Sequence, residues 1–151
     1  MIRFLQRHPP RDLLALVEGL VLFSCARLAL VLIPFRVLSR LLGEAGGESP
    51  ADIDTQKLCE AHRVGWAVRA ASRLERAPDT CLAQAIAAHL MLRRRGIPGT
   101  VYFGVAILAP GAMIAHAWVR AGSAILTGEP GHERFQVASS FGPLVSADQP
   151  Q

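Results

Sequence analysis

Apolar residues dominate the N-terminal part of the chain and predict a long helix. The stretch 13–35 carries charge only at Glu18 and Arg27, and Asp12 stands where a helix N-cap is expected. Pro34 ends or kinks this helix, because a proline ring is incompatible with a helix interior. A membrane span needs about 20 mostly apolar residues, and each charge within it costs roughly 3 kcal/mol. The two charges therefore favour a helix packed in its own domain, or against a partner, over a span or a cleaved signal.

Three more helical segments are predicted. A short helix is expected over residues 35–42, and the glycine-rich composition of 43–50 predicts a linker. Apolar residues recur at helical spacing over 54–76 and again over 81–95. The last of these is the clearest helix in the chain, since Gly96 directly after it is a typical helix stop.

The apolar period changes from helical to alternating near residue 100. Alternation over 100–108 places every second side chain on one face, as in a strand. Further strands are predicted at 113–120, 124–127 and 135–141. Helices followed by strands indicate an α+β fold with a small antiparallel sheet, and not the parallel sheet that alternating helices and strands would build.

Length and composition bound the class of protein. The chain has 151 residues, which suits a single domain with an N-terminal helical region over 1–48, a core over 50–142 and a tail over 143–151. It is 51% apolar and 19% charged, which excludes a disordered chain. The net charge is +4, and all basic residues except Lys57 are arginine. A charge this small does not indicate nucleic-acid binding.

The three cysteines are Cys25, Cys59 and Cys81. An odd number without a CxxC pair predicts neither a disulfide framework nor a cysteine-rich zinc site. We therefore expect no metal and no cofactor, and the reducing environment of the cytoplasm.

Cys81 lies in the first turn of the helix over 81–95, with Asp79 or Thr80 as its cap. The partial positive charge and free N–H groups of a helix N-terminus stabilise a thiolate, and they can also hold an oxyanion during acyl transfer. Free cysteine is also a commonly buried residue. Position alone therefore leaves a structural role for Cys81 open.

A cysteine nucleophile needs a base, usually a histidine. His116 is the candidate, because it lies within the apolar strand segment 115–119, where a polar side chain needs a partner. A core histidine bonded to the backbone is the alternative. His89 follows Cys81 by eight residues on the same helix, which is about 12 Å of rise and too far for a hydrogen bond. The remaining histidines, which lie in the N-terminal leader, an earlier helix and a loop, are His8, His62 and His132.

A third group, an acid or an amide, orients the imidazole in such sites. If residues 121–122 form a two-residue hairpin turn, Thr127 pairs with His116 and Glu129 follows on the same face. A longer loop would bring Gly128 opposite His116 instead. Thr127 and Glu129 are the local candidates.

The order of these groups resembles the papain-like transglutaminase core, in which a cysteine at a helix N-terminus precedes a histidine and an acid on strands. Residues 80–82 and 92–98, together with 115–119, resemble the small stand-alone leader peptidase of lasso-peptide biosynthesis. Residues 28–36 and 135–141 are also similar to that family. The resemblance therefore covers nearly the whole chain.

The resemblance implies a cysteine protease that removes the leader from a ribosomally made precursor peptide. Cys81 would attack the scissile carbonyl as a thiolate, and His116 would activate it and then protonate the leaving amine. A separate leader-binding protein would deliver the precursor, and a separate ATP-dependent cyclase would close the macrolactam ring.

The sequence departs from the family at the acid, because Thr127 stands in the register where the family usually has an aspartate. Glu129 is the preferred third member, with Thr127 as the alternative. The departure keeps a second hypothesis open, namely a non-catalytic scaffold or binding module of the same fold in a peptide-biosynthesis complex. A third hypothesis, a membrane-associated protein held by residues 13–35, is possible but not favoured.

Overall fold

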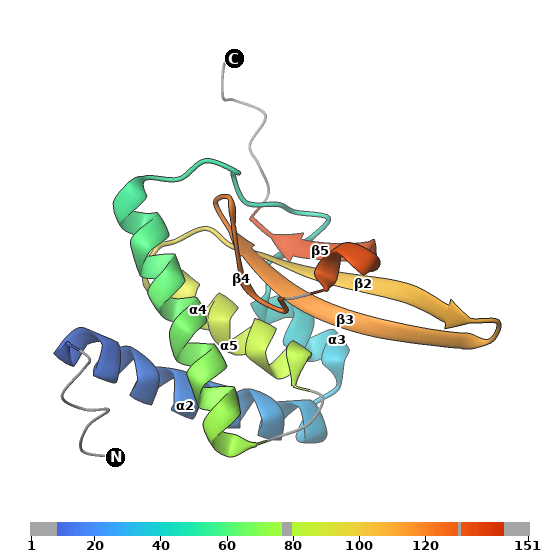
Figure 1. Cartoon of the computed structure of the whole chain (residues 1–151), viewed down its shortest axis with the longest axis horizontal. Coiled ribbons are helices and arrows are strands. Elements are labelled where there is room, and N and C mark those ends of the chain that lie inside the picture. The colour runs from blue at the N-terminus through green and yellow to red at the C-terminus, as the bar shows by residue number, and fades with distance from the viewer. Residues whose placement is uncertain (1–8, 77–79, 130, 144–151) are drawn as a thin grey trace.

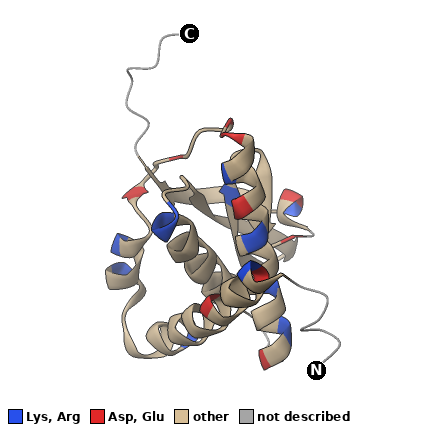
Figure 2. Ribbon diagram, turned by 90° about the vertical axis from the view of Figure 1, so that its left-hand side faces the viewer, with Lys and Arg blue, Asp and Glu red and all other residues tan. Residues whose placement is uncertain are grey.

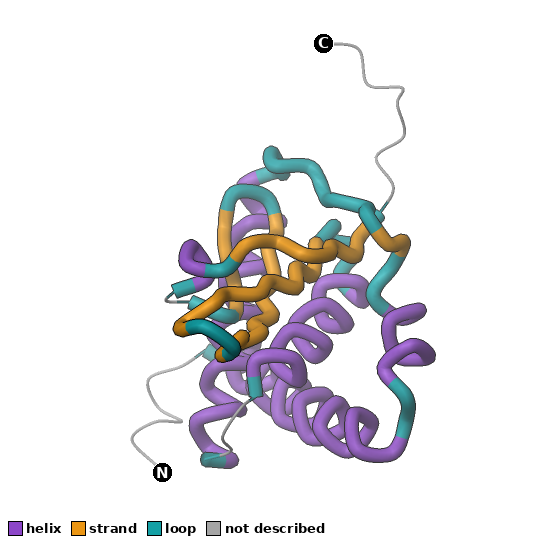
Figure 3. The backbone as a smooth tube through the Cα atoms, turned by 90° about the vertical axis from the view of Figure 1, so that its right-hand side faces the viewer, coloured by secondary structure: helices purple, strands orange, loops and turns teal. Residues whose placement is uncertain are grey.

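The computed structural model describes residues 9–76, 80–129 and 131–143. Helices pack against one face of a five-stranded antiparallel sheet (Figure 1), and a view from another side shows the sheet lying across the helices (Figure 3). The predicted α+β fold is confirmed. The interpretations that concern His8, Asp79 and residues 144–151 lie outside the described residues.

The long helices lie where the apolar spacing predicts them. The helical segments are α2 (Pro10–Leu32), α3 (Phe35–Leu38), the 3-10 helix η1 (Ser39–Leu41), α4 (Thr55–Glu75), α5 (Cys81–Arg94) and a second 3-10 helix, η2 (His132–Arg134). The prediction that Asp12 caps α2 is wrong, because the helix begins at Pro10 and the Asp12 carboxylate accepts from Arg63 Nε at 2.7 Å instead. α2 ends before Pro34, as predicted.

Both charged residues of the apolar N-terminal stretch are paired with other helices. Glu18 accepts a hydrogen bond from Arg95 Nη2 at 2.6 Å, and Arg27 Nη1 donates to Glu75 at 2.8 Å. These ion pairs tie α2 to the end of α4 and to the residue after α5. Glu18 and Arg27 thus pair with side chains of the same domain, which suits a helix packed within it.

The sheet has the strand order β1-β5-β2-β3-β4. The strands are β1 (Glu44–Ala45), β2 (Thr100–Ala109), β3 (Ala112–Ala121), β4 (Ala124–Thr127) and β5 (Gln136–Gly142). Four of them are predicted by the alternation, but β1 lies inside the predicted linker. β1 exists because Glu44 pairs with Gly142 at the far end of the chain. Gly43 allows this close approach, since a Cβ there would lie 2.6 Å from the Gly142 carbonyl oxygen.

Small residues let the helices approach closely around α5. A Cβ on Gly19 of α2 would lie 3.2 Å from the carbonyl oxygen of Ala67 on α4, so these two helices cross almost backbone to backbone. α5 packs between α2, α4 and the sheet. Half of its buried residues are alanine, and Met91 and Leu92 are fully buried near its end. This packing fixes the start of α5, where Cys81 lies.

The outer face of α2 is apolar and exposed. Six of its large aliphatic side chains are each more than half exposed: Leu14, Val17, Val21, Leu28, Val31 and Leu32. Figure 2 shows few charged positions along this helix. Within the described residues, α2 is the single helix long and apolar enough to cross a membrane, judged by length and composition only. A signal sequence or a core helix passes the same test, so this is weak evidence for a membrane.

Candidate active site

Cys81 is the first residue of α5, as predicted, and its side chain is half-buried. The Thr80 hydroxyl does not cap the helix, so the N–H groups of the first turn have no side-chain acceptor from it. Cys25 and Cys59, in contrast, are exposed on the surfaces of α2 and α4. Of the three thiols, Cys81 is the one held in a recess next to a helix N-terminus.

Gln84 supports the first turn of α5 and is missed by the sequence reasoning. Its Nε2 donates to Ser72 Oγ at 3.0 Å and to Thr80 Oγ1 at 2.9 Å, and the two hydroxyls lie 3.1 Å apart. This network ties the end of α4 to the residue before Cys81. The available signal was the spacing, because a residue three positions after Cys81 lies on the same helix face.

His116 lies on β3 opposite Gly104 of β2, and its ring packs against aromatic side chains. The ring centroid of Phe135 is 4.9 Å away and that of Trp118 is 6.1 Å away. Gly104 leaves room for this cluster, since a Cβ there would lie 2.7 Å from the Trp118 ring and 2.8 Å from Phe135. The aromatic contacts fix the plane of the imidazole.

The imidazole is also fixed by a hydrogen bond to the backbone. Its Nε2–H donates to the carbonyl oxygen of Gly128 at 2.9 Å. A carbonyl can only accept, and a neutral imidazole carries one N–H, so Nδ1 of His116 keeps the lone pair. That nitrogen is the one able to take up a proton.

One cavity of about 480 Å³ brings the predicted residues together. Cys81 comes from α5, His116 from β3, and Glu129 from the loop after β4. The cavity is lined by Thr80, Cys81, Gln84, Ala115, His116, Gly128 and Glu129. A thiol at a helix start and an imidazole with an open nitrogen therefore share one recess.

The prediction that Thr127 pairs with His116 is wrong. The hairpin turn is at residues 122–123, and an irregularity between Val119 and Arg120 places Thr127 opposite Val119. Thr127 is fully buried, and its hydroxyl has no partner among the described residues. It is not among the residues that line the cavity.

Glu129 lines the cavity and is exposed to solvent. Its charge acts on Arg69 of α4: burial and the neighbouring Arg73 lower the pKa of Arg69, and Glu129 opposes them. Arg69 itself donates to the carbonyl of Leu126. The role of Glu129 as third member stays a prediction.

Gly128 holds the carbonyl that His116 binds, and its position requires glycine. Its φ is +86°, and a Cβ would lie 2.5 Å from Trp118 Cβ and 2.8 Å from the Ala117 carbonyl oxygen. This close approach of the end of β4 to β3 places the Gly128 carbonyl oxygen within hydrogen-bond distance of the His116 ring. The sequence reasoning names Gly128 only as a possible neighbour of His116, because the hydrogen bond depends on this backbone geometry.

The other histidines of the described residues do not line the cavity. His89 lines a different cavity on the other half of α5, and His62 lies in a small surface pocket with Arg63 and Trp66. His132 packs against Trp118, with ring centroids 5.8 Å apart. Among the described residues, no group of three metal-ligating side chains could hold a metal ion.

A family model described as "Transglutaminase-like superfamily" matches residues 29–140. The matched region is well over half of the chain, and it contains Cys81, His116 and Glu129. Neither the curated proteins nor the solved structures contain a significant match.

Proposed function

Because the chain belongs to the transglutaminase-like superfamily, we propose that it is a cysteine peptidase with Cys81 as nucleophile and His116 as base. One observation carries the proposal: the two side chains, from a helix start and a strand, line the same cavity. Clustering of a thiol and an imidazole in a recess is the arrangement that nucleophilic catalysis requires.

The first step is proton transfer within the pair. His116 Nδ1 takes the proton of the Cys81 thiol, and the thiolate attacks the scissile carbonyl. The partial positive charge at the start of α5 stabilises the thiolate. The N–H groups of the first turn are donors for the oxyanion that forms. His116 then returns its proton to the leaving amine, and water hydrolyses the thioester.

The missing aspartate is replaced by a backbone group in this mechanism. The Gly128 carbonyl holds Nε2–H and so sets the tautomer that leaves Nδ1 free. A carbonyl dipole stabilises an imidazolium less than a carboxylate does. Glu129 adds a negative charge to the same cavity and compensates for part of the difference.

We propose that the substrate is the precursor peptide of a lasso peptide, cleaved after its leader in the cytoplasm. The resemblance of residues 80–82, 92–98 and 115–119 to stand-alone leader peptidases supports this substrate. In this proposal a separate leader-binding protein delivers the precursor and an ATP-dependent cyclase acts on the product. The exposed apolar face of α2 is the surface we assign to the leader-binding protein, because six large aliphatic side chains are exposed there and few charged positions lie along the helix.

The test is mass spectrometry of a precursor peptide incubated with the full chain and its leader-binding protein. We expect a cleaved leader with the wild type and an intact precursor with Cys81→Ala and with His116→Ala. Equal cleavage by wild type and Cys81→Ala would refute the peptidase. An intact precursor in every reaction, with the protein still bound in the complex, would favour the non-catalytic scaffold. That alternative stays open because, among the described residues, a backbone carbonyl and not a carboxylate binds the His116 ring.

A further inference from the structure

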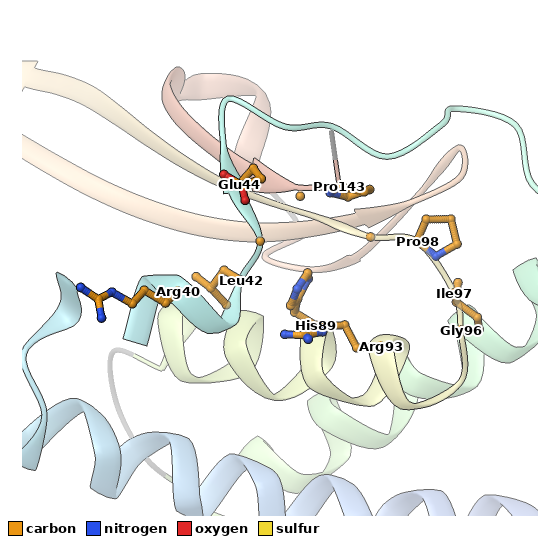
Figure 4. A pocket seen from close by; sticks show the side chains of 12 residues that line it. Arg40, Leu42, Glu44, His89, Arg93, Gly96, Ile97, Pro98 and Pro143 are labelled. Atoms are coloured by element: carbon orange, nitrogen blue, oxygen red, sulfur yellow. The ribbon is translucent and has the colours of Figure 1, made fainter. Parts of the chain in front are cut away.

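A second cavity lies on the opposite half of α5 from Cys81. It has a volume of about 660 Å³ and shares no lining residue with the Cys81 cavity. Figure 4 shows it between the last turns of α5, the chain around Leu42 and the sheet above. Its volume is within the usual range for sites that bind small molecules or single side chains, about 300–1,000 Å³.

His89 projects from α5 toward this space and has no hydrogen-bond partner. It is 3% exposed, and neither Nδ1 nor Nε2 is bonded to any described residue. Burial, assisted by the positive charge of Arg93, lowers the pKa of His89 to about 4, so the ring is neutral at pH 7. A neutral ring offers one N–H donor and one acceptor. Buried polar groups are almost always paired, so this ring calls for a partner that the chain itself does not supply.

Two arginines lie at the same cavity. Arg93 is one helical turn after His89, and its Nη1 donates to the carbonyl of Leu41 at 2.7 Å. Arg40 lines the cavity from η1. Among the described residues no carboxylate is within ion-pair distance of either arginine, and this includes Glu44, which lines the cavity as well. Neither guanidinium is neutralised by a described carboxylate, but that of Arg40 points away from His89 (Figure 4), so Arg93 is the one that can act together with the histidine.

The walls between the histidine and the arginines are apolar or lack side chains. Leu42 and Ile97 are buried, and Pro98 completes this wall. At Gly99 a Cβ would lie 3.9 Å from His89 Nδ1 and 2.7 Å from Leu92 Cδ1. Gly99 therefore lets the chain pass close to the imidazole, at a point where a side chain would first meet the end of Leu92.

We propose that the His89 cavity is an anchoring site for a peptide carboxylate carried on an apolar residue. The carboxylate accepts hydrogen bonds from the His89 N–H and the Arg93 guanidinium, and the apolar part contacts Leu42, Ile97 and Pro98. Arg93 suits this role because guanidinium and carboxylate form charge-assisted pairs. This inference rests on the proposed function. A peptide substrate anchored in this cavity would be bound at one point and cleaved at another, next to Cys81.

The test is NMR of the histidine ring signals of the full chain, titrated with N-acetyl-leucine. We expect the His89 signals to shift and saturate, with N-acetyl-leucinamide binding at least about tenfold more weakly because it lacks the charge. N-acetyl-glutamate methylamide carries its carboxylate on an acidic side chain instead: weaker binding than N-acetyl-leucine supports the terminal carboxylate of an apolar residue, and stronger binding would overturn it. Equal binding of the acid and the amide, or no shift with any probe, would overturn the proposal.

Variants test the charged side chain and the cavity wall of the same site. Arg93→Gln should weaken binding about tenfold, whereas Arg94→Gln is the matched control, because Arg94 is mostly exposed and faces Glu18. Gly99→Ala should narrow the cavity and weaken binding while the protein stays folded, since the nearest atom is the end of the Leu92 side chain. Equal losses in Arg93→Gln and Arg94→Gln would show non-specific charge attraction and overturn the site.

The anchoring site and the peptidase can fail separately. Cys81→Ala should bind N-acetyl-leucine as the wild type does, because the two cavities are distinct. Binding without any cleavage by the wild type would refute the peptidase and leave the anchoring site standing. Cleavage whose KM is unchanged in Arg93→Gln would refute the anchoring site and leave the peptidase standing.

Discussion

Gly128→Ala tests whether a backbone carbonyl orients His116, the proposed base. The new Cβ would lie 2.5 Å from Trp118 Cβ and 2.8 Å from the Ala117 carbonyl oxygen, whereas carbon atoms in contact are normally about 3.5–4.0 Å apart. The loop must therefore retreat by roughly 1 Å. Such a shift breaks the 2.9 Å hydrogen bond from His116 Nε2.

The expected loss follows from the kind of bond that is broken. A hydrogen bond to a charged group contributes about 1.5–3 kcal/mol, which corresponds to roughly a 10- to 150-fold change in rate. A left-handed alanine costs a further 1–2 kcal/mol or so, but as folding stability. We thus expect Cys81 to react about 10- to 150-fold more slowly in Gly128→Ala, with a moderate loss of stability.

The assay is the rate of Cys81 alkylation by iodoacetamide at neutral pH, followed by peptide mass spectrometry, with thermal unfolding measured in parallel. Gly131→Ala is the matched control, since Gly131 has a φ of +109° in the same loop and a Cβ there would meet only the flexible end of Arg134. It should lose similar stability and keep the wild-type rate. A folded Gly128→Ala that alkylates Cys81 at the wild-type rate would refute the orienting role of the carbonyl.

Three further predictions concern single side chains. Thr127→Val should keep the alkylation rate of Cys81 and leave the melting temperature unchanged or higher, because the buried hydroxyl has no partner among the described residues; a slower reaction would return Thr127 to the site. Glu129→Gln should slow precursor cleavage by less than about tenfold, since Gly128 still holds the ring; complete loss of cleavage would make Glu129 the essential third member. The lowered pKa of His89 means that the unfolded chain takes up a proton below its ordinary pKa of 6.5 while the folded chain resists until about 4. The contribution of His89 to the free energy of unfolding should therefore be complete above pH 6.5. It should fall toward pH 4 by up to about 1.4 kcal/mol per pH unit. Denaturant titrations should find a smaller dependence on pH in His89→Phe, and an unchanged dependence would contradict a buried neutral ring.

Local sequence patterns predict most of the elements correctly. The 3.6-residue period places α4 and α5, and the alternation places β2 and β3, because each pattern reflects burial of one face of a single element. The same logic places Cys81 at a helix start and His116 within a strand. β1 is missed because two residues carry no period, and its strand character comes from pairing with β5 near the other end of the chain.

The sequence by itself determined the α+β order, the place of Cys81 at a helix start and the place of His116 within a strand. The tertiary structure decided what surrounds them. The irregularity in the β3–β4 ladder moves Thr127 away from His116 and brings the Gly128 carbonyl to the ring. The packing of α5 against the chain around Leu42 encloses His89 without a partner. Periodicity reports which face of an element is buried, whereas register, backbone carbonyl positions and cavities depend on contacts between segments far apart in the chain.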